Sequence, residues 1–186
     1  MQQGLLMVKN ELYRHPGCAR SVYLSSIIFG ETQITQPLVS LSFFTQPSWQ
    51  AKGESVLKPA LRSLEEALEY DLIVKSAERP GDYAPLVFLV LGGRPIDAWQ
   101  DASTPLQAFT DNRRPLVIAL VTQPSLAQEV KALSQHVLYL NPVEGVCMTN
   151  FFLWVAQAIR GICEDSERGA TTINLPELPY GVVASS

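Results

Sequence analysis

The stretch that decides the fold runs from Ala84 to Trp99 and reads APLVFLVLGGRPIDAW. Its first half, Leu86 to Leu91, is an uninterrupted apolar run that stops at two glycines. A short apolar run bounded by turn residues is typical of a strand covered on both faces, as in the middle of a parallel sheet. Because ligands of open α/β sheets bind beyond the carboxyl ends of such strands, we expect a site in the loop from Gly92 to Asp97.

Further strands and helices alternate around this stretch. Apolar runs predict buried strands over residues 21–30, 115–121 and 136–140, and an edge strand over 33–42, where Pro37 interrupts the run. Helical periodicity predicts helices over residues 3–13, 55–74, 105–110, 125–134 and 148–163. The pattern predicts an α/β domain with a mostly parallel central sheet, helices on both faces and right-handed crossovers. We expect this domain over residues 1–169 and a Pro-rich, extended tail over 170–186.

Composition excludes several classes of protein. The chain has 186 residues, of which 47% are hydrophobic and 17% charged, which fits a globular domain with a sizeable core. The net charge of −4 and the lack of a Lys/Arg cluster argue against a nucleic-acid surface. No continuous apolar run approaches the roughly 20 residues of a membrane span, and the N-terminus lacks the pattern of a signal peptide. Three cysteines without a disulfide framework predict a cytoplasmic protein with reduced thiols.

The sequence contains no motif that predicts catalysis. It has no Gly-x-Ser-x-Gly elbow, no Walker A loop and no Gly-x-Gly-x-x-Gly, and Pro95 stands where a phosphate-binding loop needs a free N–H group. His15 and Cys18 would give only two ligands in one turn, too few for a zinc site. His136 opens a strand and is interpreted as structural. We therefore predict a protein that is not an enzyme and that holds no cofactor and no metal.

Four segments together resemble the von Willebrand factor A (vWA) domain. They are VYLSSIIF (22–29), AKGESVL (51–57), GDYAPLVFLVLGGRPIDAW (81–99) and HVLYLN (136–141). The chain is most similar to the bacterial TerY-type branch, which is associated with tellurium-resistance gene clusters, and the resemblance covers about residues 4–165. It implies a three-layer, Rossmann-like fold and a bacterial cytoplasmic protein of a stress-response system. It also implies protein partners, such as a kinase and a phosphatase of the same gene neighbourhood.

The same resemblance implies that a metal site has been lost. vWA domains hold a divalent cation with an Asp-x-Ser-x-Ser motif after the first strand, a Thr before the long helix and an Asp after the central strand. Here the chain begins after the first motif, Ser55 occupies the Thr position, and Gly92 occupies the Asp position beside Leu91. Asp97 lies downstream of the ligand position. Because Mg²⁺ needs several oxygen ligands, we expect a degenerate metal-ion-dependent adhesion site.

A missing first strand would leave a vacant position in the sheet. In the family that strand lies between the strands corresponding here to residues 21–30 and 84–91. Unpaired backbone groups are costly to bury, so we expect either that these two strands close on each other or that something else fills the position. The candidates are a strand from a partner, a copy of this chain, or its own tail at residues 180–184.

The expected interaction surface is the loop rim, by which we mean residues 53–55 and 92–99. The predicted partner-binding residues are Gly53, Ser55, Gly92, Gly93, Arg94, Pro95, Asp97 and Trp99. Two tryptophans near this edge, Trp49 and Trp99, are interpreted either as binding anchors or as core fillers. Two other readings stay open: a small Rossmann-like enzyme that binds a nucleotide at the same edge, or a truncated piece of an ordinary metal-binding vWA domain.

Overall fold

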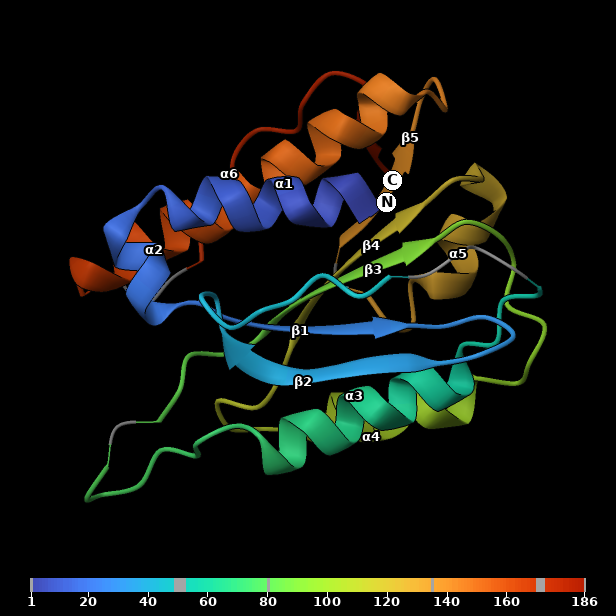
Figure 1. The fold of residues 1–186 in the computed structure, drawn as a ribbon. Helices are drawn as coiled ribbons and strands as arrows, with labels where there is room; N and C mark the ends of the chain where they lie inside the picture. The colour runs from blue at the N-terminus through green and yellow to red at the C-terminus, as the bar shows by residue number, and fades with distance from the viewer. Residues whose placement is uncertain (1, 49–52, 80, 135, 170–172, 186) are drawn as a thin grey trace. The chain divides into compact units, whose positions relative to one another are not determined.

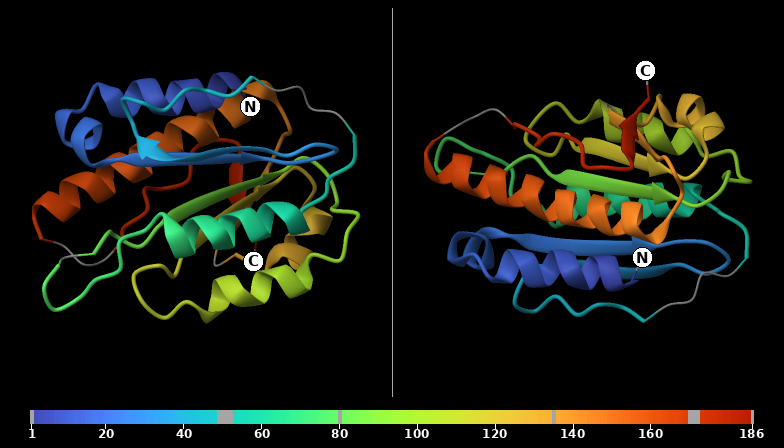
Figure 2. Two further views of the ribbon diagram at one scale, coloured as in Figure 1. Left: turned by 60° about the horizontal axis from the view of Figure 1, so that its bottom comes forward. Right: turned by 90° about the horizontal axis from the view of Figure 1, so that it is seen from above.

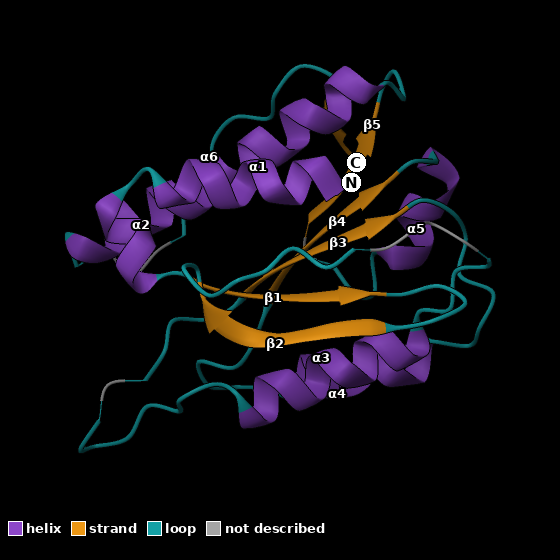
Figure 3. Cartoon of the chain, viewed as in Figure 1, coloured by secondary structure: helices purple, strands orange, loops and turns teal. Residues whose placement is uncertain are grey.

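A computed structural model describes residues 2–48, 53–79, 81–134, 136–169 and 173–185 and is mixed α/β (Figures 1 and 3). The predicted strands are confirmed, with small shifts at their ends. The elements are α1 (Gln2–Tyr13), α2 (Pro16–Ser21), β1 (Tyr23–Ile28), β2 (Ile34–Ser40), α3 (Lys58–Tyr70), β3 (Leu86–Leu91), α4 (Gln100–Ala108), β4 (Leu116–Val121), the 3₁₀ turn η1 (Pro124–Leu126), α5 (Ala127–Val130), β5 (His136–Leu140), α6 (Gly145–Glu167) and β6 (Val182–Ala184).

The main sheet has four strands in the order β3-β4-β5-β6. β3, β4 and β5 are parallel, with Leu86 opposite Leu116 and Ile118 opposite His136, and β3 and β4 lie side by side in Figure 1. The tail adds β6 in the antiparallel sense, because the Asn141 N–H donates to the Gly181 carbonyl (3.0 Å) and the Ser185 N–H to the Val137 carbonyl (2.8 Å). The tail therefore pairs with β5, and the prediction that it fills a position beside the 84–91 strand is wrong.

The strands β1 and β2 form a separate two-stranded sheet. Pro37 lies in β2, as predicted for an edge strand, since each strand of a two-stranded sheet has one open side. The prediction of a buried strand over residues 21–30 is wrong in one respect. No residue of β1 is fully buried, and Tyr23 is 58% exposed. A strand with a neighbour on only one side keeps part of its apolar surface in contact with solvent.

Burial across the main sheet also differs from the prediction for residues 86–91. Leu89 and Leu91 of β3 are buried, but its other four residues are only half-buried. In β4, by contrast, every residue from Val117 to Val121 is buried. β4 has a strand on each side whereas β3 ends the sheet, so β4 is the central strand, and the prediction that residues 86–91 form a fully buried strand in the middle of the sheet is wrong.

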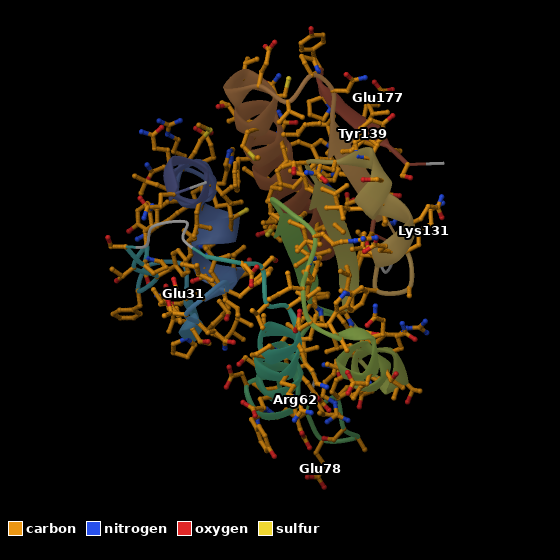
Figure 4. The ribbon with its side chains drawn as sticks, turned by 90° about the vertical axis from the view of Figure 1, so that its right-hand side faces the viewer. Glu31, Arg62, Glu78, Lys131, Tyr139 and Glu177 are labelled. Atoms are coloured by element: carbon orange, nitrogen blue, oxygen red, sulfur yellow. The ribbon has the colours of Figure 1, made fainter. Side chains whose placement is uncertain are left out.

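The chain divides into two compact units, each described here by itself. The larger unit holds residues 26–37, 53–79, 81–134, 136–139 and 184–185. Its core packs α3 and α4 against one face of β3 and β4, while Arg62 on the opposite side of α3 is exposed at the periphery (Figure 4). The main core residues are Leu57, Leu61, Leu68, Leu89, Leu91, Trp99, Leu106, Ala119, Val121, Leu126, Val130 and Val137.

The other unit holds residues 2–25, 38–48, 140–169 and 173–183. Its helix α1 lies along α6 (Figure 2), so closely that a Cβ added at Gly4 would overlap the ring of Phe152. The tail continues along α6, where the Trp154 indole N–H donates to the Pro176 carbonyl (3.0 Å). The tail is thus tied to this unit by a side-chain hydrogen bond and by the backbone hydrogen bond between Asn141 and Gly181.

Helix α6 is longer and more apolar than the sequence reading allowed. Among the helices of the described residues, it alone has the length and composition of a membrane span. Core helices pass the same test, and Phe151, Trp154 and Ala158 of α6 are buried within the structure. Its packing against α1 accounts for this apolar surface.

Several helix ends differ from the predictions for local reasons. His15-Pro16-Gly17 was expected to end helical structure, but Pro16 instead begins α2, a position that suits its fixed φ and missing N–H. The helix expected over 125–134 is split into η1 and the short α5. The helix expected over 105–110 begins earlier, at Gln100, and contains Pro105.

The turn before β6 makes Gly181 a sensitive position. Gly181 has φ +83°, and a Cβ there would overlap the Cys147 sulfur, which is fully buried in α6. We expect Gly181→Ala to lower the free energy of unfolding by about 2 to 3 kcal/mol, because strain and overlap add. Urea denaturation measures the change.

Gly169→Ala is the matched control for this prediction. Gly169 has a similar φ of +79°, but a Cβ there meets nothing within 4 Å. We expect it to cost only the backbone strain, about 1 kcal/mol. Equal losses for the two variants would show that the contact with Cys147 does not matter.

Candidate partner-binding site

The structure brings the two predicted segments of the loop rim together. Ser55 and Pro95 form a parallel β-bridge, and the Ile96 N–H donates to the Ser55 carbonyl at 2.9 Å. Because Ser55 is held in this extended pairing, α3 begins three residues later than the sequence indicated, at Lys58. Gly53, just before the bridge, is exposed and has φ +76°, a conformation that favours glycine.

Asp97 connects the rim to α3. Its carboxylate oxygens accept the backbone N–H groups of Leu57 (2.9 Å) and Lys58 (2.6 Å), at the start of the helix. The local N-cap residue, Leu57, has no side chain able to do this, so Asp97 supplies the cap from 40 residues along the chain. The negative charge also interacts favourably with the positive end of the helix dipole.

Trp99 does not belong to the exposed part of the rim. It is 2% exposed and lies in the core with Leu57 and Leu106, directly before α4. The prediction that its ring contacts a partner is therefore corrected to the core-filler alternative, because a buried ring offers no surface. The other tryptophan considered as an anchor, Trp49, lies outside the described residues.

The glycines after β3 leave the backbone open. Gly92 is exposed and Gly93 half-buried, and a Cβ added at either would meet nothing within 4 Å. The Gly92 carbonyl accepts a hydrogen bond from the Thr122 hydroxyl (3.0 Å), at the end of the neighbouring strand β4. The loop is thus fixed from one side while the backbone at the two glycines stays accessible to another molecule.

The remaining rim residues present one ion pair, one exposed apolar side chain and the exposed carboxylate of Glu54. Arg94 donates from Nε to both carboxylate oxygens of Glu129 (2.9 and 3.1 Å), and its guanidinium holds the pKa of that carboxyl below its ordinary value. Ile96 is 60% exposed between the half-buried Pro95 and Asp97. The sequence analysis did not identify Ile96, because nothing in the sequence of this loop indicates that the isoleucine is exposed.

Sequence reasoning also missed that β3 is the open edge of the main sheet. In a parallel ladder, alternate residues bond to the strand on one side. The Leu116 N–H donates to the Pro85 carbonyl (2.9 Å) and the Thr122 N–H to the Leu91 carbonyl (3.2 Å), so odd-numbered residues of β3 bond to β4. Leu86 and Val90 therefore direct their backbone N–H and C=O groups to the other edge, where the strand order has no further strand in the described part of the chain.

The rim does not offer a set of metal ligands. The only carboxylate among the predicted residues, that of Asp97, is engaged by two N–H groups, and the Ser55 carbonyl accepts the Ile96 N–H. Within the residues that the structure describes, no three His, Cys, Asp or Glu side chains lie together as a metal-binding group. The donor set present at the rim therefore does not fit Mg²⁺, which requires several oxygen ligands.

Comparison of the sequence with protein-family models gives no match, and comparison with curated proteins gives none either. Neither comparison supports or opposes the resemblance to vWA domains. The function proposed below is therefore based on the loop rim and on the open edge of β3.

The cap on α3 gives a direct test of the role of Asp97. Asp97→Ala leaves the N–H groups of Leu57 and Lys58 without their acceptor, so we expect the free energy of unfolding to fall by about 2 kcal/mol. Asp97→Asn keeps one acceptor oxygen and should lose about half as much. Urea denaturation provides both values.

Asp101→Ala serves as the control for these variants. Its carboxylate pairs with the Lys58 ammonium (2.6 Å) on the surface, and the side chain is 63% exposed. We expect this substitution to leave stability within experimental error, because exposed ion pairs contribute little. If Asp97→Ala is as mild as Asp101→Ala, the cap does not hold the rim in place.

Proposed function

We propose that the chain is a non-catalytic protein-interaction module that binds a strand of a partner at the open edge of β3, with the loop rim beside it. The observation that carries this proposal is the backbone of Leu86 and Val90, which faces the side of β3 where the strand order of the described residues ends. Main-chain hydrogen bonds to an added strand give affinity, while neighbouring side chains give specificity. Gly92, Arg94 and Ile96 follow β3 directly and would contact the same partner.

The composition of β3 supports this proposal. Natural proteins protect exposed sheet edges with charges, proline, bulges or very short strands. β6, at the other end of the sheet, is only three residues long, but β3 has six apolar residues and no charge. A long apolar edge of this kind promotes aggregation unless another chain covers it, so a partner strand is the natural occupant.

We further propose that the fold is a three-layer, Rossmann-like vWA domain with a degenerate metal-ion-dependent adhesion site. Three features support this reading: a strand position open beside β3, Gly92 in place of an aspartate, and an Asp97 carboxylate used for capping. On this reading the protein works in the bacterial cytoplasm, in a tellurium-resistance-like stress response. Its partner is a kinase or phosphatase of that system, or a copy of itself.

Amide hydrogen exchange tests the open edge. In the dilute chain, we expect the Val90 amide to exchange rapidly and the amides of Val87 and Leu89, which face β4, to be protected. At high protein concentration a second copy is available as the occupant, and the Val90 amide should then become protected. Strong protection of Val90 in a dilute monomer would contradict the proposal, because the edge would already be covered.

The variant Val90→Pro tests strand addition at the open edge of β3. Val90→Pro removes an N–H that faces away from β4, so the fold should persist, as edge positions tolerate proline. We expect its dissociation constant for a second copy, measured by sedimentation equilibrium, to rise about tenfold. Val90→Thr keeps the N–H and is the matched control, which should bind as the native chain does.

Removing cations tests the alternative of a metal-binding vWA domain, and adding nucleotides tests the alternative of a nucleotide-binding enzyme. Because the rim lacks a Mg²⁺ ligand set, EDTA should leave association unchanged. Because the Ile96 N–H is already used by Ser55 and Pro95 has none, ATP or NAD should not raise the melting temperature. Loss of association in EDTA that Mg²⁺ restores would favour the metal-binding vWA reading, and a shift of several degrees with a nucleotide would favour the enzyme.

A further inference from the structure

Two cysteines that are far apart in the sequence meet where α2 packs against α6. Cys18 lies in α2 and Cys163 near the end of α6, and the Cys163 thiol is a close neighbour of the Cys18 thiol. Ser21, one turn after Cys18 on the same face of α2, places its hydroxyl 3.9 Å from the Cys163 sulfur. Cys163 therefore lies against the face of α2 that carries Cys18 and Ser21.

The two thiols differ in accessibility. Cys18 is 1% exposed, whereas Cys163 is half-buried. Burial, reinforced by the neighbouring Cys163 thiol, raises the pKa of Cys18 to about 12, so this group is a thiol at neutral pH. A small oxidant from solution therefore reaches Cys163 first. The third cysteine, Cys147, is fully buried against Gly181.

We propose that Cys18 and Cys163 form a reversible dithiol–disulfide pair that responds to hydroperoxides and locks α2 onto α6. This inference is independent of strand addition at β3. In a reducing compartment the pair stays reduced, and a rise in peroxide changes its state.

The reaction balances with the peroxide as the only oxidant. The Cys163 sulfur attacks the peroxide, the O–O bond breaks, and Cys163 becomes a sulfenic acid while one water (or alcohol) leaves. The Cys18 sulfur then attacks the Cys163 sulfur, the S–O bond breaks, and the hydroxyl leaves as water with the Cys18 proton. Two thiols lose two hydrogen atoms and two electrons, and the peroxide is reduced. Cys163 is the first group oxidised and Cys18 the resolving thiol.

The link would join the start of the chain to the end of α6. A disulfide that closes so long a loop restricts the unfolded chain strongly. We therefore expect the oxidised protein to melt about 5 °C or more above the reduced protein.

The test uses the purified full chain, reduced and then treated with hydrogen peroxide. We expect the intact mass to fall by two hydrogen atoms, the count of free thiols to fall from three to one, and non-reducing peptide mapping to recover Cys18 joined to Cys163. Dithiothreitol should reverse all three changes. A link to Cys147, a disulfide between two molecules, an addition of oxygen atoms without a link, or no reaction would each overturn the proposal.

Single variants assign the roles. Cys163→Ala changes a half-buried residue, so the fold should persist while disulfide formation is lost. Cys147→Ala should still form the link and gain the same increase in melting temperature on oxidation. If Cys163→Ala still loses two hydrogen atoms, the assigned pair is wrong, and this outcome does not depend on whether variants of the buried Cys18 fold.

Discussion

The structure of the larger unit depends on the carboxylate of Asp97. One side chain in the loop after β3 satisfies two N–H groups at the start of α3 and so fixes the helix to the carboxyl end of the sheet. The Ser55–Pro95 bridge and the burial of Trp99 follow from the same constraint, because they flank this contact on either side. A helix end left without a partner in the interior would cost free energy that packing alone does not recover.

This use of Asp97 explains how the loop rim keeps a defined shape. In a domain that binds a cation at this edge, the ion itself would tie the loops together through oxygen ligands. Here hydrogen bonds do so: Asp97 to α3, Ser55 to Ile96, and Thr122 to Gly92. The exposed groups that remain, among them the Gly92 backbone and the Ile96 side chain, suit contact with a protein surface better than with an ion.

Sequence reasoning located the strands because apolar runs bounded by turn residues are a local property of the chain. It placed the Gly92 loop at the carboxyl end of its strand for the same reason, and it placed Ser55 at this edge through the resemblance to vWA domains. It did not find that Asp97 caps α3, because a cap supplied from a distant loop leaves no spacing signal near Leu57. It also ranked β3 above β4 as the central strand. LVFLVL and LVIALV are equally apolar, and only the strand order distinguishes them.

The two edges of the main sheet differ, and this difference bears on which partners the chain could bind. At one edge the chain covers β5 with its own tail, held by the Gly181 turn and by the Trp154 hydrogen bond to Pro176. At the other, the longer and more apolar β3 is the last strand in the order of the described residues. Adding a strand lowers the free energy at either edge, because strand backbone groups gain hydrogen bonds and apolar side chains lose contact with water. Because the tail already pairs with β5, the strand addition proposed for β3 calls for a segment other than this tail.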